Sequence, residues 1–497
     1  MGQKFPPSYG VNMRRSIFLL TATVTALLPI AVQAQVRSLN PRDVVEAQRQ
    51  HPELIKEFGG AETGPRAAYV EGVGRRVAAY SGVANPGQVY HFTTLNSAVE
   101  NAFAVPGGYI YITRQLMTLM NDESELAFVL GHETGHIAAN HAQARRSAAT
   151  RNSILGVLGA IIGNVVGSSA FGSLLSQGAQ LRTLSFSRDQ EYQADTLGTR
   201  YVVAAGYDPL GGASILASLG RADALQLRIQ GKDNRMTPEW ASTHPNSQNR
   251  VQREQQLAIQ SGRAGKGLRN RDAFLAQLEG LTVDDDPAQG VIEGRSFSHP
   301  DLRLQFVVPT GYLMQNSTSA VSIEGSAGKA QFSGGGYTGS LENYIAEVIN
   351  QLTGGRQQMT MGPPRQTTIN GLPAMYTTGR ANTSSGAVDV SVMAYRWDRD
   401  TVYHFVMLTQ AGAGIGQFAP MVDSFRRLSA LEVAAIRPRV IDVVTVQRGD
   451  TIQSLAQRMA YRDFKVDRFR SLNGLAANAS LVPGQKVKLV VYGSRRT

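Results

Sequence analysis

The sequence predicts an α+β protein made of several domains, and three observations lead to this expectation. The chain has 497 residues, which exceeds the roughly 100 to 200 residues of one domain. Apolar residues make up 42% of it and charged residues 18%, a balance typical of folded domains. Helical spacing of apolar residues dominates the first half, whereas strand-like alternation dominates between residues 290 and 430. We therefore expect a mainly helical domain with a small sheet, then an α+β domain and a small C-terminal module.

The N-terminus has the features of a secretory signal peptide. Arg14 and Arg15 precede an uncharged apolar run that ends in small residues at Ala34. We expect cleavage after Ala34 and export to the periplasm, with an uncleaved anchor as the alternative and either Met1 or Met13 as the start. After a signal peptide at 1–34, the chain is expected to divide into domains at residues 35–285, 290–432 and 438–492.

The first of these domains is expected to combine helices with a few strands. Apolar spacing predicts helices between residues 41 and 83, from Asp122 onward and from residue 187 to Gly206. Asp122 and Glu125 have the spacing of a capping box, which supports a helix start at this point. Residues 89–95 and 103–113 have the composition of strands, and a Pro-Gly-Gly turn interrupts the second.

A glycine-rich and almost uncharged segment occupies residues 152–181. It is long enough to span a bilayer, but Gly, Ser, Asn and Gln dilute its apolar character. We expect a lid or an amphipathic hairpin, with peripheral membrane contact through residues 153–175, rather than a membrane span.

The stretch "LGHETGHIAANH", residues 130–141, contains three of the eight histidines. His132 and His136 are four residues apart on the expected helix, so both imidazoles can reach one cation. Glu133 follows the first of them, where a carboxylate can act as a general base at the open position of a metal. The chain has no cysteine, so a metal site must use histidines and carboxylates. The alternative is a pair of surface histidines without a metal.

A catalytic zinc site needs a third protein ligand. A histidine ten positions after the first would supply it, but Ala142 stands there, and His141 points away from the face of His132 and His136. Glu191 on the later helix can be this ligand, and Asp195, one turn further, can accept the outer N–H of a ligand histidine. From these residues alone, a solvated acidic helix is the alternative.

Four segments, in order, resemble the zinc metalloprotease family that contains the CAAX prenyl proteases, the bacterial heat-shock membrane protease and soluble periplasmic proteases of the BepA type. They are "NAFAVPGGYIYIT", "HETGH", "FSRDQEYQADTLG…AAGYDP" and "THPNSQNR". The resemblance covers roughly residues 40–260 and implies a gluzincin fold with one Zn2+ per chain. It implies that His132, His136 and Glu191 bind the zinc, that Glu133 is the general base, and that Asp195 supports a ligand histidine.

The same resemblance suggests two further features of the site. The strand that contains Tyr109, Ile110 and Tyr111 would offer its edge to an extended peptide substrate. His244 lies in the last of the four segments, and we hypothesise that it stabilises the tetrahedral oxyanion or caps the zinc in a resting state. The alternative is that His244 is a turn histidine before Pro245.

The middle of the chain is expected to be an α+β domain of unknown role. A linker is predicted at residues 283–290, and strands are predicted at residues 302–309, 387–397 and 401–410. A helix is expected at residues 340–354, because its apolar residues share one face.

The C-terminal segments "VVTVQRGDTIQSLAQRM" and "LNGLAANASLVPGQKVKL" resemble a LysM domain. The resemblance implies two helices on a two-stranded sheet and binding of N-acetylglucosamine polymers, with peptidoglycan as the ligand. Residues 437–497 hold twelve Lys and Arg against four Asp, which favours an anionic wall. Nucleic acid is not an expected partner of an exported protein. The alternative is the same βααβ fold used only for protein contact.

Together these features predict an exported zinc endopeptidase that removes misfolded or misassembled envelope proteins and is tethered to peptidoglycan. A chaperone or scaffold with a latent zinc site is the alternative from another functional class. A cell-wall peptide hydrolase is the third hypothesis.

Overall fold

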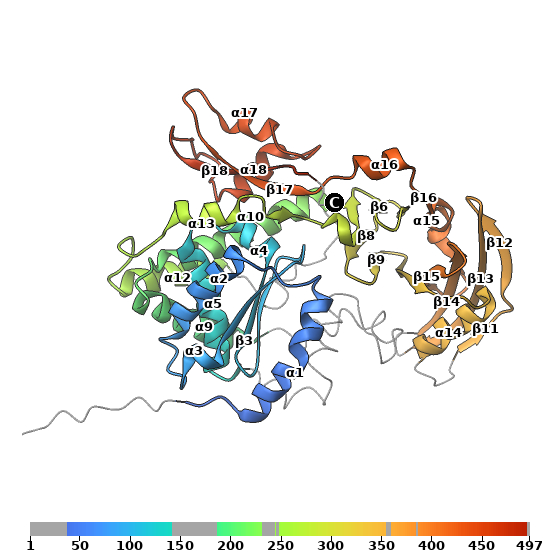
Figure 1. Cartoon of the computed structure of the whole chain (residues 1–497), viewed down its shortest axis with the longest axis horizontal. Helices are drawn as coiled ribbons and strands as arrows, with labels where there is room; N and C mark the ends of the chain where they lie inside the picture. Colours follow the sequence, from blue (N-terminus) through green and yellow to red (C-terminus); the bar gives the residue numbers. More distant parts are fainter. Residues whose placement is uncertain are drawn as a thin grey trace, which may run out of the picture. The chain divides into compact units, whose positions relative to one another are not determined.

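The computed structural model describes residues 37–141, 186–230, 244, 248–353, 359–383 and 386–494. The stretch Val36–Thr497 is one compact unit (Figure 1). The expected signal peptide and the glycine-rich segment at 152–181 lie outside the described residues. None of the helices in the described part of the chain combines the length and the apolar character that crossing a membrane requires.

A three-stranded sheet lies at the centre of the first domain. The strands are β1 (His91–Leu95), β2 (Ala102–Val105) and β3 (Tyr109–Thr113), in the order β1-β3-β2. Strand β3 is parallel to β1 and antiparallel to β2. The prediction that Tyr109, Ile110 and Tyr111 form a sheet edge is therefore wrong, because β3 is paired on both sides. The two edges of this sheet are β1 and β2.

Both faces of β3 are also covered by other parts of the domain. Tyr109 and Tyr111 pack with apolar residues of α1 (Pro41–Glu57), including Leu54. Ile110 and Ile112 belong instead to the large core on the other face of the sheet. All five residues of β3 are therefore buried.

The other helices of this domain surround the sheet, as Figure 1 shows. They are α2 (Pro65–Ala78), α3 (Pro86–Val89), α4 (Arg114–Leu119), α5 (Glu123–Ala138), α9 (Arg188–Ala204), α10 (Leu210–Gln230), α12 (Gln248–Gln260) and α13 (Arg271–Leu278). Helices α1, α2 and α3 have proline at their first turn, where the missing N–H costs no hydrogen bond. The helices and strands predicted between residues 41 and 113 are thus confirmed.

The two helices expected to carry the site begin at side-chain caps. The Asp122 carboxylate accepts from the backbone N–H groups of Ser124 and Glu125 at 3.0 and 3.2 Å. Glu125 does not close the predicted capping box on Asp122, because its Oε2 accepts from the N–H of Asn121 at 2.9 Å. Helix α9 does begin with a complete box, in which the Ser187 and Gln190 side chains bind each other's backbone N–H groups.

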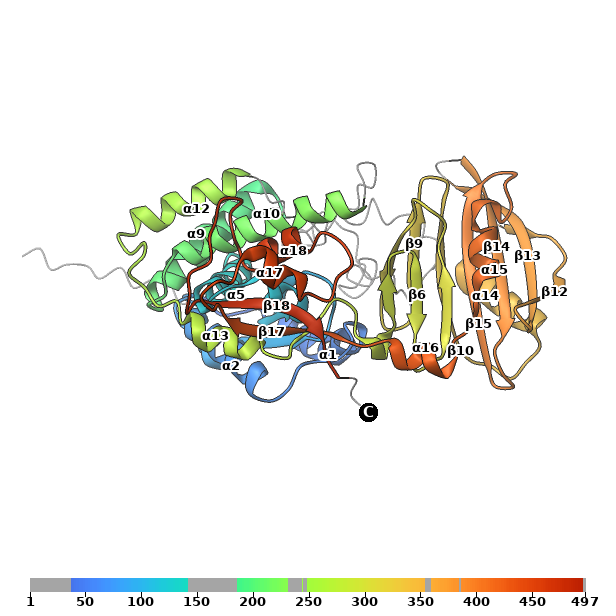
Figure 2. The same cartoon turned by 90° about the horizontal axis from the view of Figure 1, so that it is seen from above.

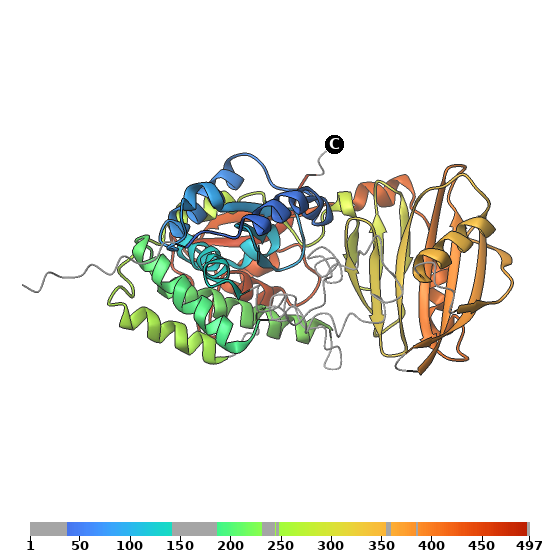
Figure 3. The same ribbon diagram turned by 90° about the horizontal axis from the view of Figure 1, so that it is seen from below.

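Two antiparallel sheets form the domain between residues 287 and 435. Eight strands form one sheet, namely β8 (Leu313–Asn316), β9 (Val321–Gly325), β10 (Gly328–Gly336), β11 (Met359–Met361), β12 (Arg365–Ile369), β13 (Leu372–Thr383), β14 (Gly386–Arg396) and β15 (Thr401–Gln410). The second sheet contains β5 (Val291–Glu293), β6 (Ser296–His299), β7 (Leu304–Val307) and β16 (Arg426–Arg427). Figures 2 and 3 show these strands from opposite sides.

Short helices complete the middle domain. They are η1 (Pro287–Gln289), α14 (Leu341–Thr353), η2 (Gly416–Phe418), α15 (Ala419–Ser424) and α16 (Ala430–Ala435). Helix α14 packs its predicted apolar face, including Ile345 and Val348, against β13 and β14. The predicted linker at 283–290 is ordered, and the Asp285 carboxylate in it accepts from the N–H of Ile292 at 2.8 Å.

The C-terminal module, residues 438–492, has the predicted βααβ order. Its elements are β17 (Arg439–Thr445), α17 (Ile452–Gln457), α18 (Lys465–Leu472) and β18 (Lys486–Tyr492). Strands β17 and β18 are antiparallel. The expected two-stranded sheet has a third strand, because β4 (Thr282–Val283) pairs with the outer edge of β17.

Candidate metal centre

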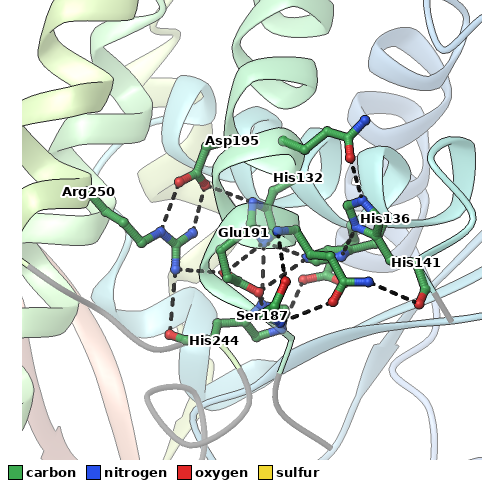
Figure 4. A network of polar contacts seen from close by, with 11 residues as sticks. His132, His136, His141, Ser187, Glu191, Asp195, His244 and Arg250 are labelled. Atoms are coloured by element: carbon green, nitrogen blue, oxygen red, sulfur yellow. Dashed lines mark hydrogen bonds and ion pairs between the residues drawn. The ribbon is translucent and has the colours of Figure 1, made fainter. Parts of the chain in front are cut away.

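The candidate metal centre lies between helices α5 and α9, and Figure 4 shows its side chains. His132, Glu133 and His136 come from α5, whereas Glu191 and Asp195 come from α9. His244 joins them from the segment before α12. All six side chains are buried. The structure thus brings together the residues that the sequence placed on two separate helices.

Glycines allow α5 and α9 to approach closely enough for this arrangement. A Cβ on Gly198 would lie 3.0 Å from the backbone nitrogen of His132. A Cβ on Gly135 would lie 3.2 Å from the carbonyl oxygen of Ala194. These separations are shorter than ordinary carbon contacts, so a side chain at either position would push the two helices apart.

Four side chains offer ligand atoms that converge on one point. These atoms of His132, His136, Glu191 and His244 all lie within 4.8 Å of one another. The Nε2 atoms of His132 and His136 are 3.0 Å apart, and each is 3.6 Å from an oxygen of Glu191. Ligand atoms of a tetrahedral zinc, each about 2.0 to 2.1 Å from the metal, are about 3.3 Å apart. The spacing and the nitrogen and oxygen donors therefore fit a divalent metal such as zinc.

Asp195 and Arg250 orient His132, the first candidate ligand histidine. The Nδ1 of His132 lies 2.9 Å from Oδ1 of Asp195, so its N–H donates to the carboxylate and Nε2 faces the cluster. Arg250 donates to both oxygens of Asp195, at 2.8 and 2.6 Å. Burial acts to raise the pKa of Asp195, but the Arg250 guanidinium and the His132 N–H hold it well below its usual range. Asp195 is therefore a permanent anion at neutral pH.

The same guanidinium also contacts the carboxylate ligand. Arg250 Nη1 lies 2.8 Å from Oε2 of Glu191. Burial acts to raise the pKa of Glu191, but His244, His132 and Arg250 together lower it. Arg250 thus offsets part of the cost of burying two carboxylates in one site.

The second ligand histidine is held by a chain of side chains. The Nδ1 of His136 lies 2.8 Å from Nδ1 of His141, and the Nε2 of His141 lies 3.0 Å from Oε1 of Gln193. Both contacts are hydrogen bonds when the Nδ1–H of His136 donates to Nδ1 of His141 and the Nε2–H of His141 donates to Gln193. The Nε2 of His136 then carries no proton and is directed at the cluster. The Phe186 ring stacks on His136 with centroids 3.7 Å apart. His141 supports a ligand and lies outside the four-residue cluster, as its spacing predicted.

His244 lies between Glu191 and Glu133. Its Nδ1 is 3.0 Å from Oε1 of Glu191, and its Nε2 is 3.5 Å from Oε1 of Glu133. His244 is 1% exposed, so it is a buried member of the site and not a surface turn residue.

Sequence reasoning missed the roles of Arg250, Gln193 and Phe186. Arg250 ends the segment "THPNSQNR", but an arginine near a histidine carries no signal that it will pair with carboxylates on another helix. Gln193 and Phe186 flank Glu191 in the segment that carries α9, and no periodicity distinguishes them from ordinary helix residues. Their roles depend on the approach of α9 to α5.

A cavity of about 230 Å3 opens beside the centre. Its walls come from α5, from the turn after β2 and from the residues before α1, and they include His136, Phe186, Ala104, Pro106 and Leu39. The cavity therefore connects a candidate metal ligand with the edge strand β2.

The sequence matches peptidase family M48 over residues 65–258, which include every side chain of the centre. This region is an M48 peptidase domain. A second match assigns residues 444–490 to the LysM domain, in agreement with the βααβ module. The resemblances stated from the sequence are thus confirmed for both domains.

Curated relatives are similar to the peptidase domain. The chain is 33% identical over 186 residues to the beta-barrel assembly-enhancing protease of Yersinia pestis, covering 36% of each chain. It is 28% identical to the mitochondrial metalloendopeptidase OMA1 of Schizosaccharomyces pombe, over 42% of this chain and 58% of that one. It is 30% identical to the metalloprotease LoiP of Escherichia coli, over 33% of this chain and 62% of that one. The similarity thus spans between about a third and three fifths of these relatives.

Proposed function

We propose that the protein is an exported, zinc-dependent endopeptidase that hydrolyses misfolded or misassembled envelope proteins. The observation that carries this proposal is the buried cluster of His132, His136, Glu191 and His244, with Asp195 and Arg250 behind it. Two imidazoles and a carboxylate are a usual set of protein ligands for a catalytic zinc. The names of the relatives from Yersinia pestis and Escherichia coli support protein substrates.

In this proposal His132, His136 and Glu191 hold one zinc ion per chain. The zinc, when bound, supplies a Lewis acid that polarises the scissile carbonyl. Glu133 follows the first ligand on α5, and its carboxylate takes the proton from the attacking water and delivers it to the leaving amine. His244 then stabilises the oxyanion through an N–H, because it lies beside both Glu133 and Glu191.

We assign the peptide-binding edge to β2 in place of β3. Asn101 and Thr113 are a hydrogen-bonded pair, since the Thr113 N–H donates to the Asn101 carbonyl at 2.9 Å. Hydrogen-bonded and non-bonded pairs alternate along an antiparallel ladder, so Ala102 and Ala104 direct their backbone groups away from β3. Ala104 also lines the cavity beside His136. An extended substrate can therefore pair with β2 while one of its side chains enters the cavity.

Proline and glycine at position 104 test this edge. Ala104→Pro removes one N–H donor from the outer edge and leaves the bonded pairs with β3 in place. We expect KM for an unfolded protein substrate such as casein to rise about tenfold, whereas Ala104→Gly, which keeps the donor, changes KM by less than about threefold. Equal KM values in the two variants would assign substrate binding elsewhere.

The peptidase activity itself is tested with Glu133→Gln in the full chain. We expect the wild type to cleave casein and Glu133→Gln to lose at least about 100-fold in kcat while its zinc content stays at one per chain. Glu53→Gln, at an exposed position on α1, is the matched control and keeps full activity. Cleavage by Glu133→Gln at the wild-type rate would refute the assignment of the general base.

The LysM domain supports a second part of the proposal, namely binding to peptidoglycan. Full-length protein is expected to sediment with purified peptidoglycan and to be released by soluble N-acetylglucosamine oligomers. Sedimentation that these oligomers do not reduce would contradict glycan recognition by this domain. Export to the periplasm is tested by N-terminal sequencing of the protein from a cell envelope fraction, which should begin at Gln35.

One observation favours the chaperone or scaffold hypothesis as a second candidate. His244 offers its Nδ1 to the same cluster as the three proposed ligands, so it can close the open position of the metal. A latent protein of this kind would suppress aggregation of an unfolded client without cleaving it. His244→Ala would then gain cleavage, whereas an oxyanion-stabilising His244 predicts a loss.

A further inference from the structure

The LysM domain shares a hydrophobic core with the peptidase domain. Buried residues of both domains belong to one continuous cluster, which includes Leu116, Leu126 and Leu219 from the peptidase and Leu455, Phe469 and Leu489 from the LysM domain. Helix α18 contacts α10 and α4, and β17 contacts α13. Figures 1 and 2 both show the LysM elements directly against these helices. A core shared in this way is typical of obligate interfaces and unlike a module on a loose tether.

Backbone hydrogen bonds join the two domains at the edge of this core. The N–H of Gly280 donates to the carbonyl of Ile441, and the N–H of Ile441 donates to the carbonyl of Leu281, both at 2.9 Å. Strand β4 continues this pairing with β17. The Tyr461 hydroxyl donates to the Asp284 carboxylate at 2.9 Å. The end of the peptidase domain therefore adds a third strand, β4, to the sheet of the LysM domain.

Lys488 of β18 contacts the backbone of the peptidase domain. Its side chain is fully buried, and its Nζ donates to the carbonyls of Thr118 and Met120 at 2.6 and 2.5 Å. Thr118 lies in the last turn of α4, whose carbonyls have no partner within the helix. Burial lowers the pKa of Lys488 to about 7, and its amine can donate these hydrogen bonds in either protonation state. Lys488 therefore acts as the C-terminal cap of α4.

The C-terminal end of α4, which Lys488 caps, leads directly into α5, the helix that carries most of the candidate site. Residues 120–122 connect α4 to α5, and α5 carries His132, Glu133 and His136. Arg271 holds the same connection, because it donates to the carbonyl of Asn121 at 2.7 Å and to the carbonyl of Lys486 at 3.0 Å. Burial raises the pKa of Glu125 in the first turn of α5 to about 8, and the charge of Lys488 acts against this rise. The LysM domain thus holds the connection to α5 through the hydrogen bonds of Lys488 and, by way of Arg271, through the carbonyl of Lys486.

We infer that the LysM domain is a built-in part of the peptidase unit, in which Lys488 is a positioning residue that holds the N-terminal end of helix α5. The effect of Lys488 on catalysis rests on the proposed function, whereas its effect on the helix does not. The domain consequently has two tasks in one fold. One is the proposed binding of wall glycan, and the other is the support that β18 and α18 give to the helix with the candidate ligands and the base.

The variant Lys488→Met tests the inference in the full chain. Methionine has a similar length and keeps an apolar stem in the buried position, but it lacks the Nζ donor. It leaves the carbonyls of Thr118 and Met120 without their donor. Lys465→Met is the matched control, because the Nζ of Lys465 donates to the carbonyl of Gln457 within the LysM domain.

We expect Lys488→Met to increase amide hydrogen exchange at residues 118–126 at least about tenfold, with zinc retained. We also expect kcat to fall by about tenfold with KM unchanged. This loss is smaller than the about 100-fold loss in rate that a 1 Å misplacement of reacting groups causes. Lys465→Met should leave both quantities unchanged. The inference is overturned if the two variants show the same exchange at residues 118–126 and the same kcat.

The exchange measurement separates this inference from the proposed function, because it does not depend on cleavage. An inactive wild type with faster exchange in Lys488→Met would refute the peptidase proposal and retain the structural role of Lys488. If Lys488→Met does not fold, the inference is tested by unfolding the wild-type protein and following the amides of α5 and β18. A single cooperative transition for α5 and β18 amides supports the built-in domain, and two separate transitions refute it.

Discussion

Arg250 is the residue whose removal gives the sharpest test of the candidate metal centre. Its guanidinium makes three contacts with carboxylate oxygens, two to Asp195 at 2.8 and 2.6 Å and one to Glu191 at 2.8 Å. All three side chains are at most 1% exposed. The variant Arg250→Met removes the positive charge and leaves both buried carboxylates without it.

The expected cost follows from this burial. Breaking a buried ion pair by removing one partner costs about 3 to 5 kcal/mol, because an uncompensated charge stays behind. A loss of about 4 kcal/mol corresponds to a fall in Tm of about 10 °C for a domain of this size. Asp195 also orients His132, so we expect metal affinity to fall by about 10-fold to 100-fold.

The assay is equilibrium unfolding of the metal-free protein, together with zinc affinity from competition with a chromophoric chelator. Arg253→Met is the matched control, since Arg253 lies on the same helix but donates to the hydroxyl of Thr196 and stacks on Tyr192 near the surface. We expect the control to lose less than about 1 kcal/mol. Equal unfolding free energies and equal zinc affinities for the two variants would refute the role of Arg250.

Three other predictions concern the packing, the pH dependence and the start of the site helix. Gly198→Ala should destabilise the metal-free protein by about 1 to 3 kcal/mol, because the new Cβ would press on His132, whereas Gly72→Ala, in open space on α2, should stabilise it. Denaturant titration of both variants decides this point, and equal effects would contradict it. Burial lowers the pKa of His404 to about 4, so the unfolded chain takes up a proton near pH 6.5 before the folded protein does. Stability is thus expected to fall as the pH drops from 6.5 to 4, by at most about 3 kcal/mol, and His404→Gln should abolish that part of the slope. Asp122→Ala should cost about 1 kcal/mol through loss of the α5 cap, measured by urea unfolding against Asp43→Ala in the first turn of α1, and no difference between the two would argue against the cap.

Much of the site could be predicted from the sequence because its signals are local. The four-residue spacing of His132 and His136 places them on one helix face wherever that helix lies. Ser187 and Gln190 cap α9 through contacts within one turn, so the start of the helix that carries Glu191 was also predictable. The resemblance to a known family supplied the pairing of these two helices, which spacing alone left open.

Other features depended on parts of the chain that are distant in sequence. The family resemblance suggested that Tyr109 to Tyr111 form an edge strand, but β3 pairs with β1 on one side and with β2 on the other, so it is central. Arg250 binds the carboxylate of Asp195, 55 residues earlier in the chain. No local pattern predicts such a partner.

The sequence by itself determined which side chains can bind a metal and where their helices begin, since helical periodicity and capping act over only a few residues. The tertiary structure alone decided that β2 is the strand with an outer edge beside the centre, that Arg250 compensates two buried carboxylates, and that Lys488 caps the helix before α5. These outcomes depend on which apolar surfaces bury one another and which buried charges then need partners. Both are properties of the packed chain, because desolvation is set by every element that surrounds a group and not by its neighbours in sequence.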